Sequence, residues 1–222
     1  MKTGQSIAKS QRGFTLVEIA IVLVIIGLLL GGVLKGQELI NSAKVKNFAN
    51  DFRNVPLYIY AYQDKFRALP GDDKNVVANL PTGATLASGT GQTPGNGNIN
   101  GNWDSTTLTE ESALFWQHVR LAGLTTGATT PAATGYFPTN ADGGRIGVES
   151  SASDFISTMT GAYLVCSTGI QGRFAKQLDI TMDDGVSNTG SMRVVATNHT
   201  RGAAAPAPPL VDDTTYTVCM AL

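Results

Sequence analysis

Glu18 is the only charged side chain in an apolar stretch of the sequence, residues 14–34. This stretch is long enough to cross the hydrocarbon layer of a bilayer as a helix, which takes roughly 20 residues. A carboxylate at mid-bilayer costs on the order of 2.5 to 3.5 kcal/mol, so Glu18 needs either a cationic partner or a shallow position. The first turn of a helix offers the shallow position, because the helix dipole favours an acid there and the side chain reaches water.

The residues that precede this stretch are polar and basic. Residues 1–13 carry Lys2, Lys9 and Arg12, contain no acid, and end in Gly13. A secretory signal has its small-residue cleavage site after the apolar region, whereas here the small residue comes before it. Cleavage at Gly13 would keep the apolar helix. Because the basic leader stays on the cytoplasmic side, we expect the body of the protein to be exported.

The run Gly13-Phe14-Thr15-Leu16-Val17-Glu18, between a basic leader and an apolar helix, resembles the class III signal of type IV pilins and type II secretion pseudopilins. The resemblance implies that a prepilin peptidase cleaves between Gly13 and Phe14 and that Phe14 is N-methylated. It also implies that Glu18 pairs with the Phe14 amino group of a neighbouring subunit. An α-amino group has a reference pKa of about 8, so it is largely cationic at neutral pH.

Small residues recur at a spacing of four in the apolar helix, as Gly27 and Gly31 and as Gly32 and Gly36. This spacing permits close approach of neighbouring helices. The alternative is the ordinary composition of membrane helices, in which Gly is common.

Residues 35–69 continue the helix with an amphipathic pattern. Apolar side chains recur at spacings of three and four, at Val45, Phe48, Phe52, Val55, Ile59, Tyr62 and Phe66. Pro56 is expected to kink this helix without ending it, because the apolar stripe persists beyond the proline. The stop is expected at residues 69–73, where Asp72 and Asp73 are interpreted as solvated turn formers and not as a catalytic acid pair.

Residues 81–102 are rich in Gly, Thr, Asn and Ser and predict a long loop. Within and just after it, Asn96, Asn98, Asn100 and Asp104 match the spacing of a calcium loop in outline. The match lacks an acidic first ligand and has Thr107 in place of the closing Glu. We therefore favour a plain turn over a weak calcium site, and expect no cofactor.

A capped helix is predicted from Ser112 to Leu121, with Thr109 as the N-cap and Gly123 just beyond the end. His118 lies on this helix without a second metal ligand at a suitable spacing, so we interpret it as structural.

Short β-prone segments at residues 162–166, 191–196 and 215–220 predict an antiparallel sheet, with a short helix at residues 171–178. Cys166 and Cys219 are the only cysteines and lie on the exported side, where a disulfide is the expected state. A metal pair and a catalytic thiol are poor alternatives; a metal site, for example, needs more ligands. The bridge would tie the last predicted strand to the first.

The fold class expected from these elements is α+β: a long N-terminal helix, membrane-spanning in its first half and amphipathic in its second, packed on a C-terminal antiparallel sheet. The expected organisation is a leader (1–13), a transmembrane or filament-core helix (14–34), its amphipathic continuation (35–69) and a globular head (70–222). A formal charge of −1 over 222 residues indicates no general nucleic-acid surface. No phosphate loop, zinc pattern or catalytic triad is evident, so an enzyme is not expected.

The resemblance implies a structural subunit of a type IV pilus-like filament. Its expected partners are the prepilin peptidase and methyltransferase, other copies of itself, related pilins, the inner-membrane assembly machinery, and membrane lipid before assembly. The expected location is the bacterial inner membrane with a periplasmic head, and then an extracellular pilus. The alternatives are a type II secretion pseudopilin in a periplasmic pseudopilus, or a minor pilin acting as an adhesin or DNA-binding tip. The candidate phosphate-binding cations for the last role are Arg173, Lys176, Arg193 and Arg201.

Replacing Glu18 tests the pairing implied by the resemblance. In Glu18→Ala, we expect cleavage after Gly13 to stay intact and filament assembly to be abolished, because the carboxylate that would set the axial register is gone. The size of the mature chain and the yield of filaments measure the two effects. Normal filaments from the variant would contradict the pairing.

Overall fold

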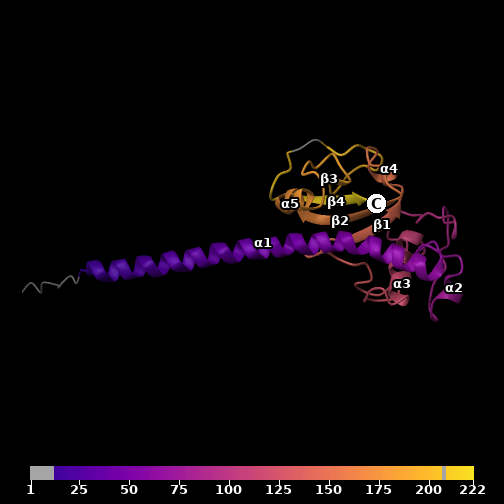
Figure 1. Ribbon diagram of the computed structural model, residues 1–222, viewed down its shortest axis with the longest axis horizontal. Coiled ribbons are helices and arrows are strands. Elements are labelled where there is room, and N and C mark those ends of the chain that lie inside the picture. Colours follow the sequence, from indigo (N-terminus) through magenta and orange to yellow (C-terminus); the bar gives the residue numbers. More distant parts are fainter. Residues whose placement is uncertain (1–12, 207–208) are drawn as a thin grey trace, which may run out of the picture. The chain divides into compact units, whose positions relative to one another are not determined.

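A computed structural model of the chain describes residues 13–206 and 209–222. The elements, labelled in Figure 1, are α1 (Leu16–Phe66), α2 (Val76–Asn79), α3 (Glu111–Leu121), β1 (Ile146–Ser150), α4 (Ala152–Phe155), β2 (Tyr163–Gln171), α5 (Gly172–Met182), β3 (Met192–Ala196) and β4 (Thr215–Ala221). The chain divides into two compact units, with the boundary between Ser42 and Ala43 inside α1. The leader cations Lys2, Lys9 and Arg12 lie outside the described residues.

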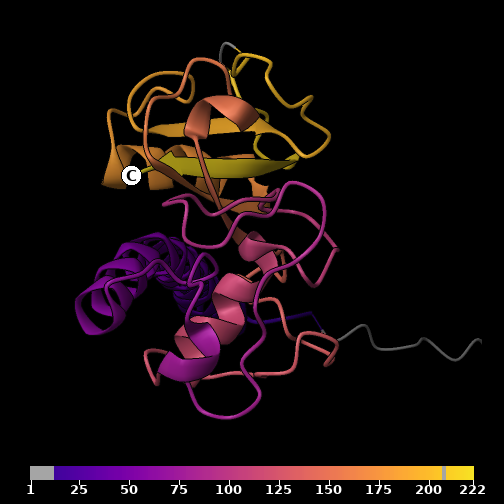
Figure 2. The same cartoon turned by 90° about the vertical axis from the view of Figure 1, so that its right-hand side faces the viewer.

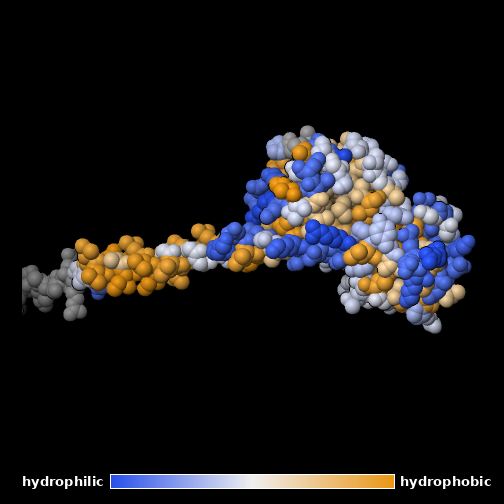
Figure 3. Space-filling view, viewed as in Figure 1, coloured by the Kyte–Doolittle hydropathy of each residue, from blue (hydrophilic) through white to orange (hydrophobic). Residues whose placement is uncertain are grey.

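The first unit is the apolar half of α1. Its Leu, Ile and Val side chains are exposed around the whole helix, and Figure 3 shows the resulting hydrophobic surface. Within the described residues, α1 is the one helix long and apolar enough to cross a membrane. The predicted apolar helix is therefore present.

The second half of α1 belongs to the head. Its buried side chains follow the predicted spacing of three and four: Val45, Phe48, Phe52, Val55, Ile59 and Tyr62. The helix continues through Pro56, as the persistence of the apolar stripe predicted. It ends at Phe66, and the next residue, Arg67, adopts a positive φ of 55°, the left-handed conformation that commonly ends helices.

The strands form one antiparallel sheet in the order β1-β2-β4-β3. The three predicted strands are confirmed, whereas β1 was not predicted from the sequence. Its sequence, Ile-Gly-Val-Glu-Ser, has few residues that favour strands. Gly147 and Glu149 are unusual in a strand, but each makes a contact with Trp103 that explains its presence. A Cβ at Gly147 would lie 2.0 Å from the Trp103 carbonyl oxygen, and the buried Glu149 carboxylate accepts a hydrogen bond from the Trp103 N–H at 2.7 Å.

Both faces of the sheet are buried, and alternate residues of each strand point to opposite cores. Val165 and Val218 join a large core that contains Phe48 of α1 and Phe174 of α5. Cys166, next to Val165 in β2, joins the second core, which is covered by α4 and neighbouring loops. Figure 2 shows the sheet of the head between α4 on one side and α3 with the second half of α1 on the other.

The predicted helices of the head are present with one correction. α3 begins at Glu111 with Glu110 as its N-cap residue, so the prediction of Thr109 as N-cap was wrong. The Thr109 carbonyl instead accepts a hydrogen bond from the Ser88 N–H at 3.0 Å, which fixes it in the preceding loop. Gly123 follows α3 with a φ of 78°, as expected beyond a helix end.

Asp72 and Asp73 lie in the turn that follows α1, as predicted, but the expectation that they are solvated was wrong, because both are buried. The Asp72 carboxylate accepts hydrogen bonds from the backbone N–H groups of Gly95, Asn96 and Gly97. Asp73 accepts bonds from the Tyr62 hydroxyl at 2.9 Å, the Asn75 N–H at 2.8 Å and the Asn79 amide at 2.8 Å. The two acids therefore anchor the long loop and the end of α1. Asp72 and the loop residues that it binds are more than twenty residues apart in the chain, so a local sequence pattern could not predict this role.

Glu111 anchors the same loop from the other side. Its carboxylate accepts the Thr93 N–H at 3.1 Å and the Asn100 N–H at 2.7 Å. Gly71 packs its backbone against this site, because a Cβ there would lie 2.4 Å from the Glu111 carbonyl oxygen. The loop predicted at residues 81–102 is thus ordered by buried carboxylates.

His118 is structural, as predicted, and its hydrogen bonds define its charge. Nδ1 accepts the Gly71 N–H at 2.8 Å, and Nε2 lies 2.9 Å from the Thr85 carbonyl oxygen, to which its N–H donates. This is the neutral imidazole, because protonation would place a second N–H against that of Gly71. Burial lowers the pKa of His118 to about 4.

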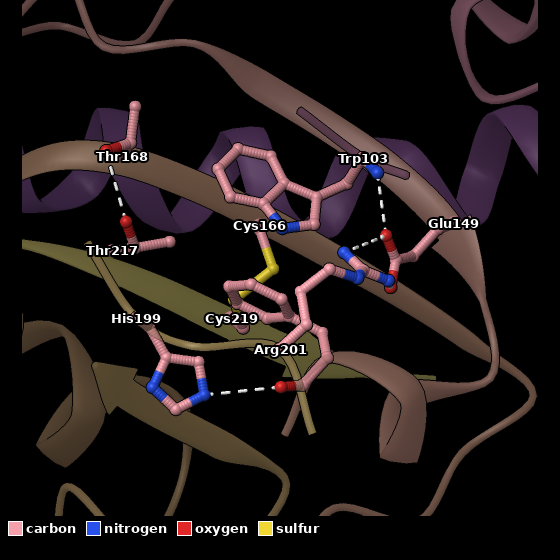
Figure 4. The surroundings of a disulfide bond; sticks show 9 residues. Trp103, Glu149, Cys166, Thr168, His199, Arg201, Thr217 and Cys219 are labelled. Carbon is pink, nitrogen blue, oxygen red and sulfur yellow. Dashed lines mark hydrogen bonds and ion pairs between the residues drawn. A yellow bond between two sulfur atoms is a disulfide. The ribbon is translucent and has the colours of Figure 1, made fainter. Parts of the chain in front are cut away.

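Cys166 and Cys219 form the predicted disulfide and are cross-strand partners in β2 and β4. The bridge lies in the second core beside Trp103 (Figure 4). Because β1 precedes β2, the bridge joins the last strand to the second strand of the chain and not to the first.

Removing the disulfide should destabilise the head. In the double variant Cys166→Ala/Cys219→Ala, we expect the free energy of unfolding to fall by up to about 4 kcal/mol, the loop-entropy value for a separation of 53 residues. Urea unfolding of the chain in detergent micelles measures this, and the wild type with reductant should match the variant. Equal midpoints for the variant and the oxidised wild type would contradict the expectation.

The neutral His118 predicts a pH dependence of stability. Between pH 6.5 and about 4 the unfolded chain binds a proton at His118 that the folded chain does not bind, so stability falls as pH falls through this range. The loss reaches about 3 kcal/mol at the low end, since each pKa unit corresponds to about 1.4 kcal/mol. Asp51 and Asp179 act in the opposite sense, because burial raises the pKa of each to about 6.

Because other groups also titrate in this range, the contribution of His118 is obtained by comparing the free energy of unfolding of the wild type with that of a His118 variant. The free energy of unfolding of the wild type minus that of His118→Gln should shrink by up to about 3 kcal/mol between pH 7 and pH 4. The variant retains one acceptor and one donor but does not titrate. Urea unfolding at several pH values measures the difference, and a difference that is flat with pH would refute the assignment.

Candidate assembly site

Thr15 and Glu18 form a reciprocal pair at the start of α1. The Thr15 N–H and hydroxyl each donate to Glu18 Oε2 at 2.8 Å, and the Glu18 N–H donates to Thr15 Oγ1 at 3.2 Å. This is a capping box, which satisfies the first free N–H groups of a helix. It holds the Glu18 carboxylate in the first turn, where the helix dipole favours an acid.

The capping box positions the Glu18 side chain within one subunit. It also leaves part of the carboxylate available to a partner outside that subunit. Both donors from Thr15 converge on Oε2, so the box does not use the second carboxylate oxygen, Oε1. The Glu18 side chain is exposed. The carboxylate is therefore held in a defined position by bonds to Oε2 that do not involve Oε1, an arrangement that suits an ion pair across a subunit contact.

Gly13 and Phe14 lie just before α1, outside the helix, and both are exposed. The bond between them is accessible, as a peptidase requires. No described atom lies within 4 Å of a Cβ built at Gly13. Packing within the described chain does not require glycine at this position.

The glycines of the apolar half of α1 are likewise not required by packing inside the chain. At Gly27, Gly31, Gly32 and Gly36, an added Cβ would meet no described atom within 4 Å. Each glycine costs about 1 kcal/mol of helix propensity relative to alanine. Close contact with helices of other molecules and the ordinary composition of a membrane helix both account for glycines at these positions.

The weak calcium candidates lie in a hydrogen-bonded turn. Asn96 Oδ1 accepts the Asn98 N–H at 2.8 Å, and the Asn100 N–H donates to Glu111. The Asp104 carbonyl accepts a bond from Arg145 at 3.1 Å. These bonds support the plain turn. In the described part of the chain, three acids close enough to hold a metal ion occur at Asp179, Asp183 and Asp184 instead.

The four cations proposed for phosphate binding each face an oxygen of the protein. Arg201 makes a two-bond ion pair with the buried Glu149, at 2.7 and 3.1 Å (Figure 4). Lys176 lies 2.7 Å from Asp212, and Arg173 lies 3.9 Å from Asp213. Arg193 is buried and donates to the Thr158 carbonyl at 3.4 Å. These pairings do not favour a strip of cations available to nucleic acid.

The comparisons with known proteins concern the N-terminal segment. Residues 8–34 match the family model described as the prokaryotic N-terminal methylation motif. A search of the curated proteins found no match. The matched range contains Gly13, Phe14, Glu18 and the apolar half of the helix that follows. The chain therefore carries the prepilin-type N-terminal signal of type IV pilins and pseudopilins.

Proposed function

We propose that the mature chain, residues 14–222, is a structural subunit of a type IV pilus-like filament. The observation that carries the proposal is the joining of a prepilin-type signal to an apolar half-helix that no described part of the chain buries. Prepilin peptidase would cut after Gly13, and Phe14 would then be N-methylated. The apolar helix would remain in the inner membrane until assembly.

Assembly would transfer the apolar half of α1 from lipid to a core made of the same half-helices from other copies. Because lipid tails are as apolar as leucine, close packing and polar pairs must favour the filament over the membrane. The glycines at positions 27, 31, 32 and 36 would allow close helix contacts. Glu18, fixed by Thr15, would pair with the Phe14 amino group of a neighbour and define the register.

The head would form the outside of the filament. It has its own two-sided core and disulfide, and so needs no help from the apolar half-helix to bury its side chains. In this organisation residues 14–34 form the membrane or filament core, residues 35–69 lead into the head and residues 70–222 form most of it. Its partners would be other copies, related pilins, the prepilin peptidase and methyltransferase, and the inner-membrane assembly machinery.

The role we infer is structural and not enzymatic. A type II secretion pseudopilin would use the same signal, helix and pairing, and differs in the place where the polymer forms. The paired state of Arg173, Lys176 and Arg201 gives no support to a DNA-binding tip.

Mass spectrometry of filaments sheared from the source cells tests the proposal. We expect this chain to be a main component, with methylated Phe14 as its N-terminal residue. If the chain is processed but found only in the inner membrane fraction and periplasm, the pseudopilin role replaces the pilus role. An unprocessed chain that still begins with the leader would contradict both.

A matched variant shows whether the loss of filaments in Glu18→Ala is specific to Glu18 or follows from the loss of any negative charge on α1. Glu38 lies on the same helix, is exposed and forms an ion pair with Lys35 at 2.7 Å. We expect filaments from Glu38→Ala at near wild-type yield, because surface pairs of this kind contribute at most about 1 kcal/mol.

A further inference from the structure

A cavity of about 180 Å³ lies between the second half of α1 and α3. Asp51 and Tyr58 line it from α1, and Trp116 and Arg120 line it from α3. Residues of the loop after α3 and the start of β1 complete its walls. Sites for drug-sized ligands have volumes of about 300 to 1,000 Å³, so this cavity suits a molecule of only a few non-hydrogen atoms.

Arg120 brings to the cavity a positive charge that no acid neutralises. The residue is 9% exposed, and its guanidinium forms no ion pair among the described residues. Its Nη1 donates to the carbonyl oxygens of Ala128 at 2.8 Å and Tyr136 at 2.6 Å, whereas its Nε has no acceptor among the same residues. The rings of Trp116 and Tyr136 attract the cation but carry no negative charge. A buried charge without a counter-ion is strongly destabilising, so an anionic group is expected beside Arg120.

The indole N–H of Trp116 is a second donor at the same cavity. Trp116 is 3% exposed, and its Nε1 has no acceptor in the part of the chain that the structure describes. Buried polar atoms nearly always have a partner in the chain, in water or in a ligand. An arginine binds a carboxylate through two parallel bonds, and an indole N–H donates to the same kind of oxygen. The side of the cavity formed by α3 therefore suits a carboxylate.

Asp51 supplies the opposite charge from α1. Its side chain is half-buried, and over the described ranges its carboxylate makes no hydrogen bond or ion pair, including with Arg120. Burial raises the pKa of Asp51 to about 6, and no neighbouring cation in these ranges lowers it again. The carboxylate is still mostly ionised at neutral pH. The side of the cavity formed by α1 therefore suits a cationic group that donates hydrogen bonds, such as an ammonium group.

The charged groups nearby that do not line the cavity have partners elsewhere. Lys44, on α1, forms an ion pair with Asp142 at 2.6 Å. Arg145, next to the cavity wall, lies over an aromatic ring and donates to a backbone carbonyl. Asp51 and Arg120 are thus the charged side chains that line the cavity within the described residues. A ligand with a single charge would leave one of them without a counter-ion, whereas a zwitterion satisfies both.

We propose that this cavity binds a small free amino acid, with its carboxylate on the Arg120 side and its ammonium group on the Asp51 side. Each charge of the zwitterion then meets the opposite charge of the protein. The volume is sufficient, because a cavity of about 150 Å³ admits benzene, which has as many non-hydrogen atoms as L-alanine. Val55 and Ile146 offer apolar surface to a methyl side chain. This binding is independent of the proposed role in a filament.

Calorimetric titration and thermal unfolding test the proposal on the mature chain in micelles of a non-ionic detergent, at neutral pH and in a buffer free of amines and carboxylates. We expect L-alanine to bind one site with a Kd of about 10⁻³ M or tighter, a modest affinity because so small a ligand makes few contacts. It should also raise the melting temperature. Acetate carries only the carboxylate and ethylamine only the ammonium group, so each should bind at least tenfold more weakly.

Two variants locate the site. Asp51→Asn keeps the shape of the side chain and removes its charge, so we expect L-alanine to bind at least tenfold more weakly and no better than acetate. Without ligand this variant should melt at or above the wild-type temperature, because a half-buried charge is removed. Trp116→Phe removes the N–H donor and retains an aromatic ring, and should weaken L-alanine and acetate alike. Asp64→Asn, at an exposed position on α1 outside the cavity, is the matched control and should bind as the wild type.

No heat of binding and no change in melting temperature for the wild type, with L-alanine at about ten times the expected Kd, would overturn the proposal and leave a cavity that holds only water. Acetate or ethylamine binding as tightly as L-alanine would overturn the choice of a zwitterion. Unchanged L-alanine binding by Asp51→Asn would place the site elsewhere. None of these results bears on filament formation, which the mass spectrometry tests separately.

Discussion

The hydrophobic surface of the N-terminal half of α1 is the constraint on which the rest of the molecule depends. The side chains from Leu16 to Leu34 are exposed around the whole helix. Water cannot surround an apolar surface of this kind without a large free-energy penalty, so the segment requires lipid or other apolar helices. Residues 8–34 carry a prepilin-type signal, and the expected cleavage after Gly13 would retain this segment in the mature protein.

The same constraint explains the construction of the head. Under the proposed function the apolar segment leaves the membrane for a polymer, so the head must be stable without it. Here the sheet is buried on both faces, the disulfide joins two adjacent strands, and buried carboxylates order the long loop. Buried carboxylates accept hydrogen bonds in the head, and Glu18 does so at the start of α1. There the capping box with Thr15 fixes the position of the one acid in the apolar segment.

The sequence predicted the features that depend on local patterns. The period of α1, the three regular strands, the helix α5 and the pairing of Cys166 with Cys219 all follow from spacing, β-propensity or cysteine count. The strand β1 was missed because its Gly147 and Glu149 serve contacts with Trp103, far away in the chain. The roles of Asp72 and Glu111 were missed for the same reason. A carboxylate appears polar in sequence, and only the fold reveals that it is buried and which groups surround it.

An electron cryomicroscopy map of the isolated filament tests the central claim most directly, because it locates the apolar half of α1 in the polymer. The account predicts that these half-helices pack together in the filament core, with the Glu18 carboxylate within about 4 Å of the Phe14 nitrogen of a neighbouring subunit. Filaments in which residues 16–34 face solvent, or in which Glu18 lies far from every Phe14 amino group, would contradict it.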